Sequence, residues 1–511
     1  MKKEITLDGN HLSIEELDHF CEGALDPNCE LKINISQESI KKINAAHEQL
    51  LKIASEDKAV YSVNTGFGVF AEVKIEKDKL LELQENIIRS HSVGVGPLLG
   101  RDSVISMWIL RLNTICRGHT GVSLETLNDV IKILEAGILA EIPSQGSVGA
   151  SGDLCPSAHA TLACLGEGRA SAIKDGKFVS MPASEALAGS KVKAIKLKVK
   201  EGLSFINGTQ LSTALAAKAC LRGLRLLKQA NLNLAMAMEG LRASHLFLNP
   251  LIMKEKKHPG CLHVANEVAS WLEGASNIKN SHVDCEMVQD PYSLRCAPQV
   301  HGAIFEDLNY AKTIIEREIN ASNDNPLLFP EHNLSISNGN FHAVYPARAS
   351  DLISSALSTL SNISERRTAL AMNPATSRLP TFLIKEGGLH SGFMMAQVTS
   401  AALVSENKSL SFPASVDSIP TNADKEDHVS MGPIAGVKAL KITDNTCHVL
   451  AIEALCMAQA IELQRPNTST KKIEAVHSKI RKKIPFLEKD RNLSLDINNM
   501  TKLIKQKALG I

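Results

Sequence analysis

The sequence has few aromatic residues, no excess of charge of one sign and no closely spaced cysteines. Aromatic residues make up 4% of the 511 residues, with four Tyr and two Trp, which argues against a base-stacking surface or a β-sandwich core. The 56 Lys and Arg residues balance 55 Asp and Glu residues, so the formal net charge is +1. This balance argues against nucleic acid or an anionic membrane as the main partner and favours a small molecule.

The eleven cysteines fit neither a disulfide framework nor a zinc site, because their number is odd and no two stand in a C-x2-4-C spacing. The bland interpretation is small buried residues in a reducing compartment. The N-terminal residues lead into polar sequence rather than into the apolar stretch of a signal peptide. We find no later run of about 20 residues apolar enough to span a bilayer, and we expect a soluble, cytoplasmic protein without a membrane partner.

The apolar pattern predicts a mainly α protein with a core bundle of long helices. The 43 residues from Glu201 to Ala243 contain no proline and are rich in Ala, Leu and Met. In this stretch Lys218, Arg222 and Arg225 fall on one narrow stripe, and the rest of the helix surface is apolar, as in a buried bundle helix. The pattern recurs at residues 349–372, 391–408 and 434–464.

The N-terminal part is expected to be smaller and mixed, with short strands. Residues 1 to about 200 are punctuated by Gly and Pro, and Asp175-Gly176 between two short apolar segments predicts a β-hairpin. We therefore divide the chain into a mixed part, 1–200, and a part formed by the long-helix bundle and C-terminal helices, 201–511. The basic segment from Lys471 to Lys483 is interpreted as a solvated helix face.

A glycine-rich segment from Gly146 to Leu154 interrupts the helical pattern. Its G-x-x-G-x-x-G spacing superficially resembles a phosphate loop, but no Gly-Lys-Ser/Thr follows and no clear βαβ unit surrounds it, so we expect no nucleotide. One interpretation is a tight turn that enters a helix, with Asp153 or Ser157 as the helix cap.

The small residues Ala150, Ser151 and Gly152 offer a chemical interpretation of the same segment. Attack of the Gly152 amide nitrogen on the Ala150 carbonyl carbon would close a five-membered ring. Loss of water from the ring, and of the Ser151 hydroxyl as a second water, would leave a methylidene group conjugated to an imidazolone. A Cβ on the attacking residue would obstruct this approach. The product would be a built-in electrophile.

This segment resembles the signature of the aromatic amino acid ammonia-lyases and aminomutases. That family makes 4-methylideneimidazole-5-one from the tripeptide, so the resemblance implies that this prosthetic group forms autocatalytically from Ala150, Ser151 and Gly152, with no required metal. The resemblance covers nearly the whole chain. Further blocks of the family, in the family's order, are Tyr61-Ser62-Val63-Asn64-Thr65-Gly66-Phe67-Gly68, Arg89-Ser90-His91, Asn207-Gly208-Thr209-Gln210, Gln289-Asp290-Pro291-Tyr292-Ser293-Leu294-Arg295, Asn323-Asp324-Asn325-Pro326, Gly339-Asn340-Phe341-His342 and Glu426-Asp427-His428-Val429-Ser430-Met431.

Elimination of ammonia from an α-amino acid faces a poor leaving group and a weakly acidic β-hydrogen. A covalently held electrophile addresses the first obstacle by capturing the substrate amine, and a positioned base addresses the second. The resemblance implies that Tyr61 is the base and that Arg295 clamps the substrate carboxylate through its rigid fork. It also implies roles around the prosthetic group and the carboxylate for Tyr292, Gln289, Asn207 and Phe341.

Taken one at a time, these residues also have bland interpretations, which stay open. Tyr61 and Phe341 suit core packing, Arg295 an ion pair, and Asn207 a helix cap. The chain also departs from the family pattern at two places, because Cys155 and Ser157 replace the Ala and Leu of Asp-Leu-Ala-Pro-Leu, and Tyr-Ser-Val-Asn replaces the commoner Tyr-Gly-Ile-Asn.

The choice of substrate depends on His91 and Glu426. A histidine side chain needs hydrogen-bonding partners and gains from a nearby carboxylate, whereas a phenyl or phenol ring has no use for a buried carboxylate. Glu426 therefore favours histidine, and its block has the form found in the histidine branch of the family. His91 fits the same branch, although tyrosine-specific members also place a His there. Singly, each also suits a surface Glu or a satisfied core His.

The resemblance thus implies elimination of ammonia from L-histidine to give urocanate, the first step of histidine breakdown. The alternatives are a tyrosine ammonia-lyase or 2,3-aminomutase on the same scaffold, and an inert helical protein that kept the fold. Fumarase-like lyases and metal hydrolysis lack support, since neither Gly-Ser-Ser-x-Met-Pro nor His-Glu-x-x-His occurs. The resemblance also implies a homotetramer whose active sites combine residues from three chains.

Overall fold

The computed structural model describes residues 1–56, 65–66, 68–70, 73, 75–76, 79–282 and 288–510. By its internal contacts the chain divides into two compact units, each assembled from segments that lie far apart in the sequence. The first unit comprises Met1–Leu221, Lys312–Asp351 and Pro413–Val437, and the second comprises Arg222–Ala311, Leu352–Phe412 and Lys438–Ile511. The division at residue 200 that the sequence suggests stays a prediction.

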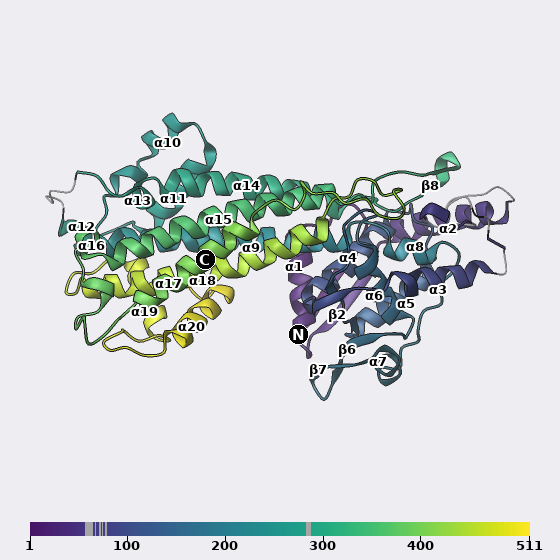
Figure 1. The fold of residues 1–511 in the computed structure, drawn as a ribbon, viewed down its shortest axis with the longest axis horizontal. Coiled ribbons are helices and arrows are strands. Elements are labelled where there is room, and N and C mark those ends of the chain that lie inside the picture. The colour runs from purple at the N-terminus through teal and green to yellow at the C-terminus, as the bar shows by residue number, and fades with distance from the viewer. Residues whose placement is uncertain are drawn as a thin grey trace. The chain divides into compact units, whose positions relative to one another are not determined.

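The first unit contains short helices and small sheets (Figure 1). Its helices are α1 (Ile14–Glu22), α2 (Gln37–Ser55), α3 (Leu80–His91), α4 (Arg101–Cys116), α5 (Leu124–Glu135), α6 (Leu154–Cys164), α7 (Ala183–Gly189) and α8 (Glu201–Ile206). Its strands are β1 (Lys2–Leu7), β2 (Glu30–Ile35), β3 (Val95–Leu98), β4 (Leu139–Ala140), β5 (Pro143–Gln145), β6 (Arg169–Lys174), β7 (Lys177–Pro182), β8 (Leu327–Phe329) and β9 (Leu334–Ile336). Strands β1 and β2 pair in parallel, whereas β3–β5, β4–β6–β7 and β8–β9 are antiparallel.

The predicted hairpin at Asp175-Gly176 is confirmed. Lys174 of β6 pairs with Lys177 of β7, so the two residues between them make the whole turn. Both have positive φ, 51° for Asp175 and 69° for Gly176, which is the backbone shape that a tight two-residue hairpin turn requires.

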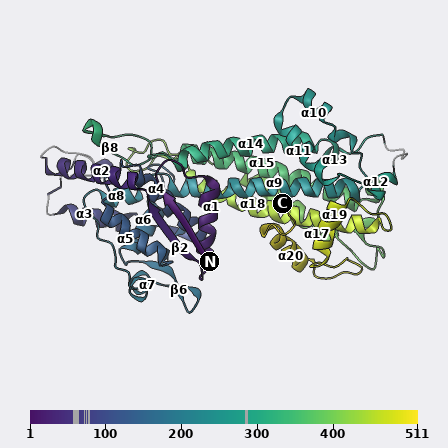
Figure 2. The same ribbon diagram turned by 180° about the vertical axis from the view of Figure 1, so that it is seen from behind.

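Long helices contribute residues to both units and form the bundle that the sequence predicts. They are α9 (Gln210–Gly240), α14 (Ala297–Ile319), α15 (Val344–Met372) and α18 (Gly432–Leu463). In the second unit they run side by side in both views (Figures 1 and 2). A Cβ at Gly223 of α9 would lie 3.2 Å from Leu308 of α14 and 3.5 Å from Leu357 of α15, and one at Gly240 would lie 3.0 Å from Ala460 of α18. Small residues thus allow α9 to approach its neighbours closely.

Shorter helices complete the second unit. They are α10 (Pro250–Lys256), α11 (Pro259–Trp271), α12 (Asn277–Asn280), α13 (Tyr292–Arg295), α16 (Pro374–Ser377), α17 (Met394–Leu410), α19 (Lys471–Arg481) and α20 (Leu493–Lys505). Helix α19 buries Ile473, Val476 and Ile480 and leaves Lys471 and Lys479 exposed. The interpretation of this basic segment as a solvated helix face is therefore confirmed.

The prediction of one continuous helix from Glu201 to Ala243 is wrong. Helix α8 ends at Ile206, and α9 begins only at Gln210. Between them Gly208 has φ +123°, and its backbone hydrogen-bonds to the glycine-rich segment instead of continuing the helix. The absence of proline did not reveal this break, because a glycine and long-range hydrogen bonds produce it.

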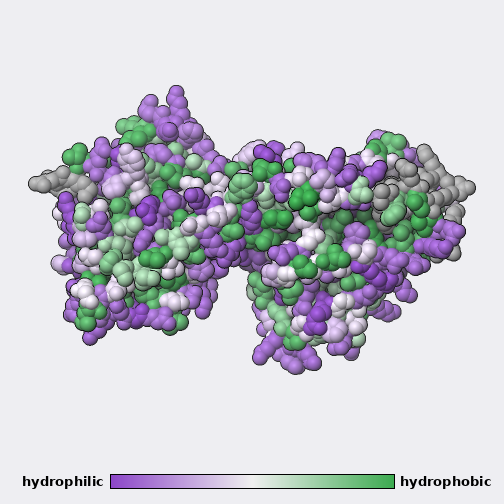
Figure 3. Space-filling model, viewed as in Figure 1, coloured by the Kyte–Doolittle hydropathy of each residue, from purple (hydrophilic) through white to green (hydrophobic). Residues whose placement is uncertain are grey.

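Helix α18 also corrects the expectation that no run of the sequence is apolar enough to span a membrane. By length and composition this helix passes that test, and 83% of its apolar window is buried inside the structure. Every residue from Val449 to Ile461 is buried, as in the central helix of a bundle. On the face in Figure 3, hydrophilic residues are spread over both units.

Candidate active site

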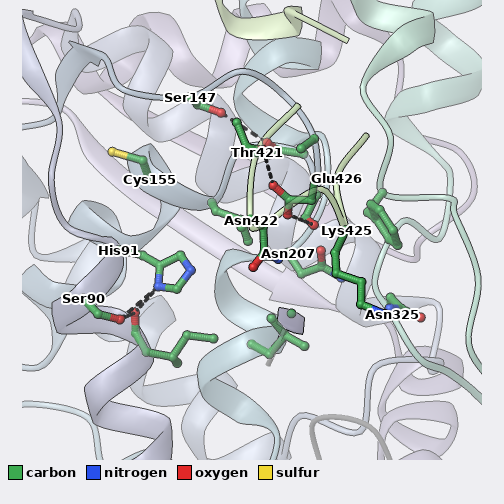
Figure 4. Close-up of a pocket in the computed structure, with 18 of the residues that line it drawn as sticks. Ser90, His91, Ser147, Cys155, Asn207, Asn325, Thr421, Asn422, Lys425 and Glu426 are labelled. Carbon is green, nitrogen blue, oxygen red and sulfur yellow. Dashed lines mark hydrogen bonds between the residues drawn. The ribbon is translucent and has the colours of Figure 1, made fainter. Parts of the chain in front are cut away.

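A cavity of about 1020 Å³ lies within the first unit. Several separate parts of the chain line it, including most residues of the segments 146–155 and 421–428 (Figure 4). Among the residues that the sequence analysis singled out, the cavity is lined by His91, Ala150, Ser151, Gly152, Asn207, Phe341 and Glu426. The fold thus brings together seven of the predicted site residues, which come from five blocks of the sequence.

The glycine-rich segment is fixed by direct backbone contact with the break between α8 and α9. The Asp153 amide donates to the Gly208 carbonyl oxygen at 2.8 Å, and the Gly208 amide donates to the Ser151 carbonyl oxygen at 3.2 Å. Gly152 lies between these bonds with φ +74°, and a Cβ there would stand 2.1 Å from the Gly208 carbonyl oxygen. Only glycine fits at position 152, for reasons of both backbone shape and space.

The other end of the segment is held by the residues just before α18. The Met431 amide donates to the Val148 carbonyl oxygen at 2.8 Å, and the Ser430 hydroxyl donates to the Gly149 carbonyl oxygen at 2.7 Å. A Cβ at Gly149 would lie 2.2 Å from the Ser430 Oγ. Residues 148–153 are therefore fastened on both sides, which holds Ala150, Ser151 and Gly152 against the cavity.

Asp153 occupies the N-cap position of α6, but its side chain does not cap the helix. Instead its carboxylate accepts hydrogen bonds from the Ser212 amide at 2.8 Å and the Ser212 hydroxyl at 2.7 Å. Burial raises the pKa of Asp153 to about 6, against the lowering effects of the Ser212 bonds and of the Arg111 charge. The carboxylate thus ties the site segment to the first turn of α9.

Arg111 and Asp324 form a buried polar network behind the cavity. Arg111 donates to the carbonyl oxygens of Ser204, at 3.1 Å, and Asn207. Asp324 accepts from the Lys200 ammonium at 2.6 Å, from the Ser204 hydroxyl at 2.9 Å and from the Asn207 amide group at 3.3 Å. Asn207, which the sequence placed at the site, is thereby fixed through both its backbone and its side chain.

The sequence analysis missed Arg111, Lys200 and the structural role of Asp324. A signal was present for Arg111, which stands alone as a charge in the apolar run Met107-Trp108-Ile109-Leu110-Arg111-Leu112. All of that run is buried, and a buried charge needs partners. Nothing comparable marks Lys200, whose ammonium meets Asp324 only through the tertiary fold.

His91 ends α3 with its ring at the cavity (Figure 4). Its Nδ1 lies 2.8 Å from the Ile87 carbonyl oxygen, which requires a proton on Nδ1 and leaves Nε2 as an acceptor in the neutral ring. Burial lowers the pKa of His91, and the Ile87 bond and the charge of Glu426 oppose this effect. His91 therefore favours the neutral form and can accept a hydrogen bond from a ligand.

Glu426 lies in a short loop that presents its carboxylate to the cavity (Figure 4). Its Oε1 accepts from the Ser151 hydroxyl at 3.0 Å, and its Oε2 accepts from the Thr421 hydroxyl at 2.7 Å. The backbones of Thr421 and Glu426 also pair with each other through two hydrogen bonds. Glu426 is therefore held at a defined position, and it touches the serine of the predicted ring-forming tripeptide.

Cys155, which stands where the family pattern has Ala, also lines the cavity. Glycines make room for it, because a Cβ at Gly146 would lie 2.9 Å from the Cys155 Sγ and one at Gly94 would lie 3.3 Å from it. Burial raises the pKa of the Cys155 thiol, which keeps it in the protonated, unreactive form.

Gln289, Tyr292 and Arg295 belong to the second unit and do not line the cavity. They form a cluster of their own, in which the Arg295 guanidinium donates to the Gln289 side chain and to the Asp290 carbonyl oxygen, each at 2.9 Å. The guanidinium carbon lies 4.6 Å from the centre of the Tyr292 ring, and 69% of Tyr292 is exposed. The cluster thus presents a cation and an aromatic ring at the surface.

A buried ion pair contacts the backbone of this cluster. Arg367 donates to the Ser293 carbonyl oxygen at 3.3 Å and pairs with Glu453, and both side chains are fully buried. Tyr61, the predicted base, lies outside the described residues. Among the described residues, no group of three or more His, Cys, Asp and Glu side chains is arranged to hold a metal ion.

The Gly152 contact can be tested by two matched substitutions. Gly152→Ala and Gly176→Ala both place a side chain at positive φ, +74° and +69°, but only the first meets a neighbouring atom, since nothing lies within 4 Å of a Cβ at Gly176. We expect Gly176→Ala to lower the free energy of unfolding by about 1 to 2 kcal/mol, and Gly152→Ala to lower it clearly further. Equal losses in urea denaturation would contradict the close approach.

The burial of Asp153 predicts a pH dependence of stability. The raised pKa, about 6 against 3.8 for an unperturbed carboxyl, means that the folded chain retains a proton that the unfolded chain has already lost. As the pH rises from about 4 to about 6, Asp153 should therefore lower the free energy of unfolding by something on the order of 3 kcal/mol. The check is urea denaturation of wild type and Asp153→Asn across this range. A difference between the two proteins that does not change with pH would refute the assignment.

Comparison with known proteins places the chain in a family. The model of the family described as aromatic amino acid lyase matches residues 12–482. A histidine ammonia-lyase of Stigmatella aurantiaca is 42% identical over 98% of this chain and 96% of its own length. The solved structure of histidine ammonia-lyase from Trypanosoma cruzi is 42% identical, with a TM-score of 0.91 over 99% of this chain and 94% of that one. Tyrosine aminomutase from Streptomyces globisporus is 32% identical, also with a TM-score of 0.91, over 99% and 97% of the two chains. The chain belongs to the aromatic amino acid lyase family.

Proposed function

We propose that this chain is a carbon–nitrogen lyase that eliminates ammonia from L-histidine to give urocanate, the first step of histidine breakdown, in the cytoplasm. The observation that carries the proposal is the Glu426 carboxylate in the cavity, beside the ring-forming tripeptide and on the same cavity as His91. The full-length similarity to histidine ammonia-lyases supports it.

The residues around the tripeptide fit a ring closed from Ala150, Ser151 and Gly152. Gly152 has no Cβ to obstruct attack by its nitrogen, and the contact with Gly208 leaves no room for one. The Ser151 hydroxyl, which must leave as water, donates a hydrogen bond to the Glu426 carboxylate. The resulting 4-methylideneimidazole-5-one would supply an electrophile that captures the substrate amine and turns it into a better leaving group.

His91 and Glu426 are suited to hold the imidazole of the substrate. Neutral His91 offers an acceptor at Nε2, because its Nδ1 proton is bonded to Ile87, and Glu426 offers carboxylate oxygens. Two acceptors match the two N–H groups of a protonated imidazole. A protonated imidazole withdraws electrons from the neighbouring carbon, so binding in this form makes the β-hydrogen easier to remove. Phe341 would contribute an apolar wall.

The remaining groups follow from the resemblance to the family. Arg295 would bind the substrate carboxylate, with Tyr292, Gln289 and Asn207 around the carboxylate and the prosthetic group, and Tyr61 would remove the β-proton. The Arg295 cluster belongs to the second unit, and the cavity belongs to the first. By the same resemblance, we infer that a homotetramer completes each site and that a neighbouring subunit supplies the Arg295 cluster.

The substrate assignment predicts a selective loss of activity in Glu426→Gln. We expect purified wild-type protein to form urocanate from L-histidine, and to form no coumarate from L-tyrosine or cinnamate from L-phenylalanine, when the conjugated product is followed by ultraviolet absorbance. Loss of a charged hydrogen bond costs about 1.5 to 3 kcal/mol, so Glu426→Gln should lower kcat/KM for L-histidine about 10- to 100-fold, when the rate is expressed per chain whose mass shows a matured tripeptide.

A matched control is Asp427→Asn, which removes a carboxylate from the next residue at the same cavity. It should retain most of the histidine activity. Coumarate or β-tyrosine from L-tyrosine would assign the chain to the tyrosine branch. No product from any of the three substrates would favour an inert scaffold.

The shared site predicts that two inactive variants rescue each other. His91→Ala and Arg295→Ala should each lose most activity. When both are produced in one cell, some sites in mixed oligomers should combine an intact His91 with an intact Arg295 from another chain, and activity should return. If both residues of a site came from the same chain, mixing would restore nothing. Light scattering on the same samples should give the mass of four chains.

A further inference from the structure

We propose that Glu426 has a second task, as the acid that protonates the Ser151 hydroxyl when it leaves during formation of the prosthetic group. This inference rests on the proposed function only in assuming that the tripeptide cyclises. It assigns to one carboxyl group both the maturation of the site and the later recognition of the substrate.

The structure places the Glu426 carboxyl in direct contact with the leaving oxygen. The Ser151 Oγ and the Glu426 Oε1 lie 3.0 Å apart. The Thr421 hydroxyl holds the second oxygen of Glu426 at 2.7 Å, and the paired backbones of Thr421 and Glu426 fix the start of the side chain. The carboxyl is thus oriented before any substrate arrives.

Two other polar side chains of the tripeptide segment are engaged elsewhere. Both carboxylate oxygens of Asp153 accept hydrogen bonds from Ser212. The Ser147 hydroxyl donates to the Gly152 carbonyl oxygen at 3.2 Å. Among the hydrogen bonds of the described residues, the carboxyl that meets the Ser151 hydroxyl is that of Glu426.

Two dehydrations complete the group. In the first, the Gly152 nitrogen bonds to the Ala150 carbonyl carbon, and the proton of that nitrogen passes to the carbonyl oxygen. The resulting hydroxyl then leaves as water together with the Ser151 amide proton, and a C=N bond forms between the Ala150 carbon and the Ser151 nitrogen. In the second, a water molecule takes the Cα proton of Ser151, the electron pair forms the Cα=Cβ bond, and the C–Oγ bond breaks. The proton passes from that water molecule to the Glu426 carboxylate and from Glu426 to Oγ, which departs as water and leaves Glu426 as a carboxylate again. No oxidant or reductant is needed.

This step explains how one carboxylate can serve twice. Before maturation the Glu426 Oε1 is occupied by the Ser151 hydroxyl. Once that hydroxyl has left as water, the same oxygen has lost its partner and faces the cavity as a free acceptor. Loss of the hydroxyl therefore completes the electrophile and releases the carboxylate that the substrate imidazole requires.

The test follows the mass of newly made full-length chains rather than their activity. Wild type, Glu426→Gln and Asp427→Asn are produced by cell-free translation, and the intact mass is recorded over time. Wild type and Asp427→Asn should lose the mass of two water molecules. Glu426→Gln can still hydrogen-bond to Ser151 but has no acidic proton, so its loss of the Ser151 hydroxyl should be about 100-fold slower or more. Ser151→Ala marks the mass of the unmatured chain.

A Glu426→Gln chain that matures at the wild-type rate would overturn the proposal. If this variant folds poorly by circular dichroism, Thr421→Val replaces it, because it removes the hydroxyl that holds the second carboxylate oxygen. Slower maturation of Thr421→Val would then support the proposal, and an unchanged rate would overturn it. A wild-type chain that keeps its full mass would overturn the proposal together with the prosthetic group. Slow maturation of Glu426→Gln, together with a matured wild-type protein that forms no urocanate from L-histidine, would leave this proposal standing and refute the substrate assignment alone.

Discussion

The close approach of two backbone segments at Gly152 and Gly208 is the constraint on which the site depends. A Cβ at Gly152 would lie 2.1 Å from the Gly208 carbonyl oxygen, so neither segment could hold its position with an ordinary residue there. The same contact lies in the gap between α8 and α9, and it holds the backbone of Ser151 through the Gly208 amide. The tight turn at Gly152 and the gap between α8 and α9 thus meet in one backbone contact.

Buried charged side chains hold the two segments that meet at Gly152 and Gly208. Asp153 ties the tripeptide segment to Ser212 on α9, and Arg111 holds the carbonyl oxygen of Asn207. Charged side chains are costly to bury without hydrogen-bonding partners. Here the partners of Asp153 and Arg111 are Ser212 and the Asn207 backbone, which lie next to the site. The protein therefore uses polar groups inside its apolar helices to fix the geometry of a loop, which apolar packing alone would leave free to slide.

The sequence predicted the long helices well, because their apolar periodicity is local. It predicted the hairpin at Asp175-Gly176 for the same reason, since a turn type is set by the two residues that make it. The break at Gly208 escaped prediction because its cause lies at Ser151 and Asp153, more than fifty residues earlier in the chain. Predictions from local pattern fail where a long-range hydrogen bond decides the backbone.

For the site too, the sequence identified residues but not the contacts between them. The chemistry of Ala-Ser-Gly and the motif blocks brought His91, Asn207, Phe341 and Glu426 to attention before their shared cavity was known. The sequence had no means of showing that Glu426 hydrogen-bonds to Ser151, or that Lys200 pairs with Asp324. Both are contacts between distant segments, and a motif names its residues without giving the distances between them.

The central claim is that the chain builds its own electrophile from Ala150, Ser151 and Gly152. The most direct measurement is mass spectrometry of the peptide that contains these residues, from protein purified in an active state. The account predicts a peptide lighter than its sequence by two water molecules, with the loss confined to the tripeptide. A peptide of full sequence mass in a protein that releases ammonia would contradict it.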